Sequence, residues 1–79
     1  MYAFTPWLCQ IWNGQKLVTS IENLSIDAGR EIARAHNVFG EDVRLWAENG
    51  AEDYIEVWPA QGPVRRGTFG ETTLVRVPA

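Results

Sequence analysis

The chain has 79 residues, of which 46 % are hydrophobic and 22 % charged, and its formal net charge is -3. This length predicts one small domain over residues 1–79, in which a large catalytic cleft would compete with the core for space. The acidic balance, with an isoelectric point of about 4.9, disfavours a general nucleic-acid binder, because such proteins need a basic surface to release counterions. Cys9 is the single cysteine, which excludes an intrachain disulfide and a thiolate metal cluster.

The N-terminal segment MYAFTPWLCQIW is apolar, but it lacks a basic start and is interrupted by threonine, proline and glutamine. Signal peptides begin with a basic region, and membrane spans need about 20 nearly uninterrupted apolar residues. We therefore expect neither in this segment, and we expect the protein to act in the cytoplasm of a host cell.

A β-hairpin is the first predicted element. Residues 8–12 and 15–21 flank Asn13-Gly14, the strongest short hairpin signal, because a type I′ turn needs positive φ at both central residues. A two-residue loop of this kind pairs Trp12 with Gln15 and Cys9 with Val18. Both faces of the hairpin are apolar, so the alternation does not decide which one is buried. One face is expected to carry Trp7, Cys9, Ile11 and Val18, and the other Leu8, Trp12 and Leu17.

A helix is predicted next. Ser25 suits the N-cap, Asp27 places a carboxylate at the positive end of the helix dipole, and Gly40 stands where a left-handed residue ends a helix. Gly29 lies in the first turn, where it weakens the helix by about 1 kcal/mol relative to alanine. The apolar stripe expected to face the sheet has helical spacing and consists of Ala28, Ile32, Ala35 and Phe39.

Three further strands are predicted at residues 42–48, 54–58 and 72–77, with a turn at Asn49-Gly50 between the first two. Residues 65–70, RRGTFG, are expected to form a loop or a bulged edge. The resulting order is β-β-α-β-β-β, which indicates an α+β fold: an antiparallel sheet of four to five strands with one α-helix packed on one face. The opposite face stays exposed unless a partner or a curled edge covers it.

Catalytic chemistry is not indicated. His36 is the only histidine, and its place near the helix end is typical of a partly exposed side chain that meets the helix dipole. No glycine-rich segment follows a strand and opens a helix, so phosphate-binding loops are not expected. The segment GPVRRGTFG could hold an anion, but an arginine pair there is more typical of a charged sheet edge. We expect neither an enzyme nor a cofactor or metal site.

An acidic hairpin is the first candidate binding surface. If Ile55 and Val57 face the core, Tyr54, Glu56 and Trp58 share the outward face of the strand. Aromatic anchors beside charge are typical of protein-binding surfaces, although cross-strand packing of the two rings accounts for the same pattern. The partner-binding residues predicted from this surface are Glu48, Glu52, Asp53, Tyr54, Glu56 and Trp58.

A basic surface is the alternative. Arg30 and Arg34 lie one helical turn apart and project from the same side of the helix. Glu31 lies beside them, so the helix surface can balance its own charge. A small nucleic-acid-binding domain would use these two arginines together with another pair elsewhere in the chain, which gives the set Arg30, Arg34, Arg65 and Arg66.

The run SIDAGREIARAHNVFGEDVRLWAE, residues 25–48, follows the predicted hairpin. It resembles small phage and mobile-element modules with β-β-α-β order, among them DpnD/PcfM-like proteins and phage-encoded anti-CRISPR proteins. The resemblance implies a non-catalytic inhibitor that occupies a basic nucleic-acid channel or a subunit interface of an RNA-guided surveillance complex. The residues that carry it are Ser25, Asp27 and Ala28 at the helix start and Val43, Leu45 and Trp46 in the next strand.

We therefore expect a phage-type anti-CRISPR inhibitor that binds a subunit of a CRISPR-Cas surveillance complex and blocks target nucleic-acid binding. Carboxylates on a rigid sheet would stand in for phosphates against the lysines and arginines of that partner. The alternatives are a small nucleic-acid-binding domain and a homodimeric accessory protein whose open sheet face forms the interface. No membrane partner is expected.

Overall fold

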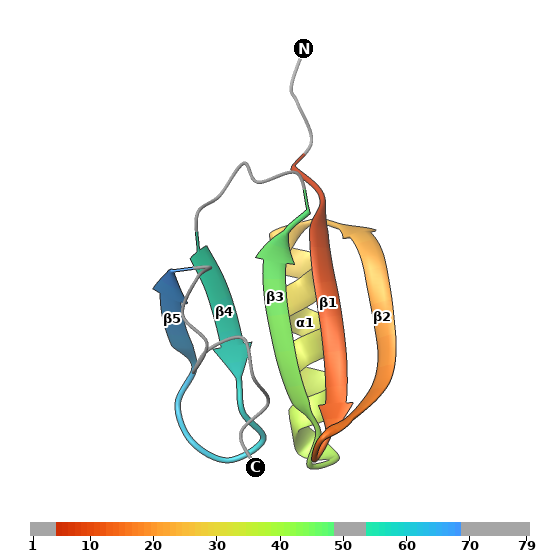
Figure 1. Ribbon diagram of the computed structural model, residues 1–79, viewed down its shortest axis with the longest axis vertical. Coiled ribbons are helices and arrows are strands. Elements are labelled where there is room, and N and C mark those ends of the chain that lie inside the picture. Colours follow the sequence, from red (N-terminus) through yellow and green to blue (C-terminus); the bar gives the residue numbers. More distant parts are fainter. Residues whose placement is uncertain (1–4, 49–53, 69–79) are drawn as a thin grey trace.

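The computed structural model describes residues 5–48 and 54–68. One antiparallel sheet carries one helix, and the strand order is β2-β1-β3-β4-β5. The expected α+β class and β-β-α-β-β-β order are confirmed. Figure 1 shows the helix behind β1 and β3, on one face of the sheet. The elements are β1 (Trp7–Asn13), β2 (Lys16–Leu24), α1 (Ile26–Val38), β3 (Asp42–Ala47), β4 (Tyr54–Trp58) and β5 (Arg65–Thr68).

The β1–β2 hairpin exists, but its predicted register is wrong. Asn13 pairs with Lys16, so the two loop residues are Gly14 and Gln15, and Gly14 has a positive φ of 64°. The turn needs a positive φ at its first loop residue, and glycine adopts this conformation without strain. The turn itself leaves Lys16 and Leu17 on their expected faces, but a bulge beside Ile11 moves Thr19 to Ile21 to the other face relative to β1. Val18, expected beside Cys9, is 48 % exposed.

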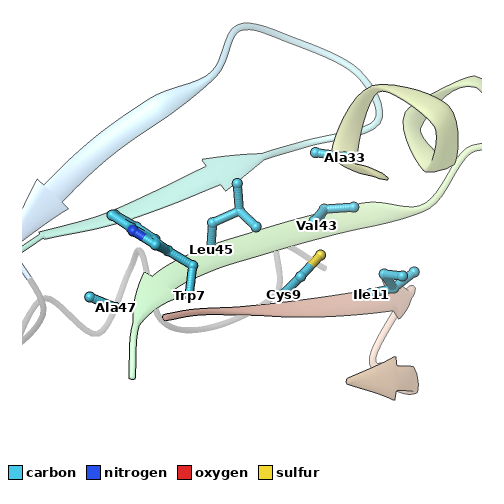
Figure 2. Packing of buried hydrophobic residues seen from close by; sticks show 7 residues of the cluster. All are labelled: Trp7, Cys9, Ile11, Ala33, Val43, Leu45 and Ala47. Atoms are coloured by element: carbon cyan, nitrogen blue, oxygen red, sulfur yellow. The ribbon is translucent and has the colours of Figure 1, made fainter. Parts of the chain in front are cut away.

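The main core lies between α1 and the sheet face formed by β1 and β3 (Figure 2). Alternate residues of each strand point to this face, because side chains along a strand alternate between its two sides. The antiparallel pairing of β1 with β3 then sets Cys9 opposite Leu45 and Ile11 opposite Val43. The buried members of the core are Trp7, Cys9, Ile11, Ala33, Val43, Leu45 and Ala47.

The ends of α1 are as expected. Ser25 has extended φ and ψ, and its hydroxyl accepts a hydrogen bond from the Ala28 backbone N–H at 3.1 Å. Asp27 lies in the first turn, and Gly40 follows the helix with a φ of 81°. These local signals therefore place the helix along the chain correctly.

The predicted apolar stripe of α1 is correct only in its first half, where Ile32 packs against the main core. Gly29 and Ala33 are the buried helix residues, whereas Ala35 and Phe39 are exposed. The reason is the close approach of the helix to the sheet at Gly29: a β-carbon there would lie 2.9 Å from Leu45 Cδ2. Glycine is thus needed for packing at the position where helix propensity alone counts against it.

The edge of the sheet in the C-terminal half differs from the prediction. β5 (Arg65–Thr68) pairs antiparallel with β4, so the described part of the segment expected to be a loop or a bulged edge forms the edge strand of the sheet. The predicted strand at residues 72–77 and the predicted turn at Asn49-Gly50 lie outside the described residues. On the sheet face away from α1, Ile55 and Val57 are buried and pack with Trp46 as a second apolar cluster.

Candidate binding surface

The pairing of β3 with β4 decides which side chains of β4 could meet a partner. Leu45 lies opposite Glu56 and Val43 opposite Trp58, so Tyr54, Glu56 and Trp58 share the face that carries α1 and the main core. The expected outward face for these three residues is therefore wrong. Tyr54 and Trp58 are partly buried and pack against the main core, as cross-strand packing predicts.

Glu56 is the centre of a buried ion cluster that we call the Glu56 cluster (Arg30, Glu56, Trp58 and Arg66). Glu56 is only 2 % exposed. Its Oε1 accepts hydrogen bonds from Arg30 Nε at 3.2 Å and Trp58 Nε1 at 3.0 Å. Its Oε2 accepts from Arg30 Nη2 at 2.5 Å and Arg66 Nη2 at 3.0 Å. The carboxylate thus joins α1, β4 and β5, and it is not available to a partner protein.

Two opposing effects act on the pKa of Glu56. Burial removes water from the carboxylate and raises its pKa. Hydrogen bonds from Arg30, Trp58 and Arg66, together with the positive charge of Arg30, lower it, and the net result is a pKa below the ordinary glutamate value. The carboxylate therefore stays charged at neutral pH inside the protein.

Of the other acids in the predicted set, the structure describes Glu48, which does not join the Glu56 cluster. Glu48 is exposed beyond the end of β3, and its Oε2 accepts a hydrogen bond from the Asn23 backbone N–H at 2.7 Å. Glu52 and Asp53 lie outside the described residues. A continuous acidic surface with Glu56 as a member is thus excluded, because that carboxylate points toward the helix.

The fold brings together three of the four arginines of the alternative basic set. Arg30 and Arg66 bond Glu56, while the Arg34 guanidinium lies 5.5 Å from the Trp58 ring centroid and the Arg66 guanidinium lies 4.3 Å from that of Tyr54. Nearby acids offset their charge: Arg34 pairs with Glu31 at 2.6 Å, and Asp27 acts on Arg30. Arg65 is separate, since it lies opposite Val57 on the other face of the sheet.

A surface that the sequence did not predict lies at the end of α1. Val38 and Phe39 are 82 % and 80 % exposed, and Arg34 and Ala35 are exposed one turn earlier on the same helix. We call these four residues the helix-end surface. The helical period assigned Phe39 to the core, but Phe39 is the C-cap residue, where the chain leaves the helix and the period no longer applies. The adjacent pair Val38-Phe39 directly before Gly40 was the available signal.

Catalytic groups do not gather in the part of the chain that the structure describes. Cys9 is buried, and burial raises the pKa of its thiol to about 11. His36 bonds Glu41 through Nδ1 at 2.6 Å. Within residues 5–48 and 54–68, no group of three or more histidine, cysteine, aspartate and glutamate side chains could hold a metal ion, and no helix is long and apolar enough to cross a membrane.

The buried thiol of Cys9 gives a direct test of the core. At pH 8 the native protein is expected to leave a thiol-reactive disulfide reagent unreacted for hours, because reaction needs an exposed thiolate. Addition of guanidinium chloride should then release one equivalent of the coloured product. Fast reaction without denaturant would contradict the position of Cys9 between α1 and the sheet.

No protein-family model, curated protein or solved structure matches the chain.

Proposed function

We propose that the protein is a non-catalytic inhibitor of the anti-CRISPR type, which binds a subunit of an RNA-guided surveillance complex and blocks uptake of target nucleic acid. The contact is made by the helix-end surface in place of the acidic hairpin. The observation that carries this proposal is the exposure of Val38 and Phe39, two adjacent apolar side chains more than three-quarters accessible to solvent. Pairs of this kind are typical of protein interaction sites when the backbone beneath them is rigid.

The backbone below Phe39 is held in place by several hydrogen bonds. Its own N–H donates to the His36 carbonyl at 3.0 Å, and the Gly40 N–H donates to the Asn37 carbonyl at 3.0 Å. The Asn37 side chain donates to the Glu41 carbonyl at 2.8 Å and to the Trp58 carbonyl at 3.0 Å, which ties the turn to β4. A partner therefore meets an anchor that loses little conformational entropy on binding.

The composition of the helix-end surface favours a protein partner. Phe39 and Val38 would enter an apolar pocket, and Arg34, already oriented over Trp58, would lie at its rim. Apolar anchors in desolvated pockets with charge at the rim are the usual source of binding energy in protein complexes. The resemblance of residues 25–48 to anti-CRISPR proteins makes a surveillance complex the first partner to test.

The test compares two double variants in binding and inhibition of purified surveillance complexes. Val38→Ser/Phe39→Ser is expected to weaken binding by about 100-fold, the loss typical of removing an apolar anchor, while the thermal midpoint changes little. Leu17→Ser/Val18→Ser is the matched control, since it removes two exposed apolar side chains from β2. Equal inhibition by both variants, or no binding by the wild-type protein, would refute the proposal.

Nucleic-acid binding is the second candidate, because Arg30, Arg34 and Arg66 gather beside two aromatic rings. Stacking of bases on such rings supports single-strand binding. A labelled oligonucleotide retained at low salt and released steeply as salt rises would favour this candidate over the inhibitor. Sedimentation at twice the monomer mass, without binding to either partner, would favour a homodimeric accessory protein.

A further inference from the structure

The two ends of the sheet differ in the charge that they expose. Because neighbouring strands are antiparallel, β1 meets β2 at the same end at which α1 leads into β3 and β4 leads into β5 (Figure 1). We call this end the turn end, and its residues include Lys16, Phe39, Glu41, Asp42 and Arg65. The helix-end surface lies at the turn end, since Val38 and Phe39 come shortly before the start of β3.

The accessible charge of the turn end is positive. Lys16 and Arg65 are exposed, and neither has a carboxylate within 4.0 Å in the described part of the chain. The two acids at this end are half-buried and engaged within the protein. Glu41 Oε1 lies 2.6 Å from His36 Nδ1, and Asp42 Oδ1 accepts a hydrogen bond from the Ala60 backbone N–H at 2.7 Å. A partner that approaches the turn end therefore meets cations before it meets acids.

The described residues of the opposite end expose negative charge. Glu22 lies near the end of β2, Asp27 in the first turn of α1 and Glu48 directly after β3, and all three are exposed. Within residues 5–48 and 54–68, none of them has a lysine or arginine within 4.0 Å. A separation of charge like this orients a protein during its approach to a charged partner.

Lys16 lies on the same side of the sheet as the helix-end surface. Cys9 and Ile11 belong to the main core beneath α1, and Asn13 follows in the same alternation, so its partner Lys16 also lies on the helix side. Two strand spacings, about 10 Å, separate β2 from β3. A standard protein interface covers about 800 Å² on each partner. One partner that contacts Phe39 therefore also reaches Lys16.

We propose that the site on the surveillance complex is a contact between its protein subunits, an apolar pocket with an acidic rim, and not a basic nucleic-acid channel. This inference rests on the function proposed above and specifies the partner site. Val38 and Phe39 fill the pocket, and Lys16 and Arg34 face the acids of its rim. A channel that holds nucleic acid is basic and would repel the same cations. The inhibitor then blocks target uptake by occupying a subunit contact, without imitating phosphates.

A second copy of the chain and a nucleic acid fit the turn end less well. Two turn ends that faced each other would bring Lys16 and Arg34 of one copy against the same cations of the other, and like charges repel across an interface. A nucleic acid binds mainly through its phosphates, which offer no apolar pocket to Val38 and Phe39.

The test exchanges the two charges of β2. Lys16→Glu/Glu22→Lys keeps the net charge at -3 and reverses the polarity of the strand, at two exposed positions where substitutions affect stability little. Its association with purified surveillance complexes is expected to be about tenfold slower than that of the wild type at low salt. The difference should disappear near 1 M salt, where the Debye length is about 3 Å.

Val38→Ser/Phe39→Ser separates this inference from the function on which it rests, because loss of an apolar anchor is expected to raise the dissociation rate. Equal or faster association of Lys16→Glu/Glu22→Lys would overturn the inference in favour of a basic channel and leave the helix-end contact in place. No binding by the wild-type protein would overturn both. Binding of a labelled oligothymidine that the charge exchange abolishes would overturn the inference in favour of a nucleic acid. Sedimentation as a dimer that Val38→Ser/Phe39→Ser dissociates would overturn it in favour of a second copy.

Discussion

Replacing Glu56 with glutamine is expected to lower the free energy of unfolding by about 3 kcal/mol, the lower end of the range for removing one member of a buried ion pair. The amide cannot accept all the bonds that Arg30, Arg66 and Trp58 now donate to the carboxylate. The loss is expected at the lower end of this range because Arg30 and Arg66 are both partly exposed to water. Urea unfolding followed by tryptophan fluorescence measures the difference.

Glu31→Gln is the matched control for this prediction, since it removes the exposed pair between Glu31 and Arg34. Exposed pairs contribute little, and the control is expected to stay within about 0.5 kcal/mol of the wild type. Equal stability of the two variants would mean that the Glu56 cluster does not hold β5 and α1 to β4.

The Glu56 cluster also predicts how stability depends on pH. The folded protein holds the pKa of Glu56 below the ordinary glutamate value of 4.5, so the unfolded chain takes up this proton first as the pH falls. The stabilisation is complete above about pH 4.5 and is lost as the pH drops through the folded pKa. Acid unfolding of Glu56→Gln should therefore show a shallower decline in this range than that of the wild type. If the stability of the wild type and of Glu56→Gln fell in parallel as the pH drops, the lowered pKa of Glu56 would be contradicted.

Substitution of Gly29 by valine is the second change with a large expected effect, a loss of about 2–3 kcal/mol in the free energy of unfolding. Helix propensity alone predicts a small gain, but a β-carbon at this position would lie 2.9 Å from Leu45 Cδ2 in the buried core. Overpacking then forces the helix away from the sheet. Circular dichroism during thermal unfolding measures the loss.

Ala35→Val is the control for Gly29→Val, because residue 35 is exposed on the same helix. Its cost should be limited to the lower helix propensity of valine, less than about 1 kcal/mol. If Gly29→Val were as stable as this control, the close packing of α1 on β3 would be wrong.

The sequence predicted the order of the elements because the signals for it are local. Ser25 caps the helix through its own side chain, and Gly40 provides the left-handed residue that ends it. The faces of these elements were harder to predict. The turn consists of Gly14 and Gln15 in place of Asn13 and Gly14, and a bulge beside Ile11 changes the faces of Thr19 to Ile21. Neither a change of one residue in the turn nor a bulge can be resolved from the flanking pattern.

The same limit applies to the candidate site. Glu56 looked like a surface acid because charged residues usually are exposed, and its partner Arg30 is 26 residues away in the chain. Such long-range pairs depend on how α1 lies across the sheet, which no local pattern contains. The exposure of Phe39 has another cause: Phe39 is the C-cap residue, where the helical period that assigned it to the core no longer applies.

The place of β1 between β2 and β3 has a consequence for folding during synthesis. The β1–β2 hairpin can form as soon as Leu24 has left the ribosome, since its two strands are adjacent in the chain. The other edge of β1 has no partner strand until the residues from Asp42 to Ala47 have been made. At about 5–20 residues per second, this edge of the hairpin therefore stays unpaired for about a second or more, and a chaperone that binds nascent chains could bind it in this interval.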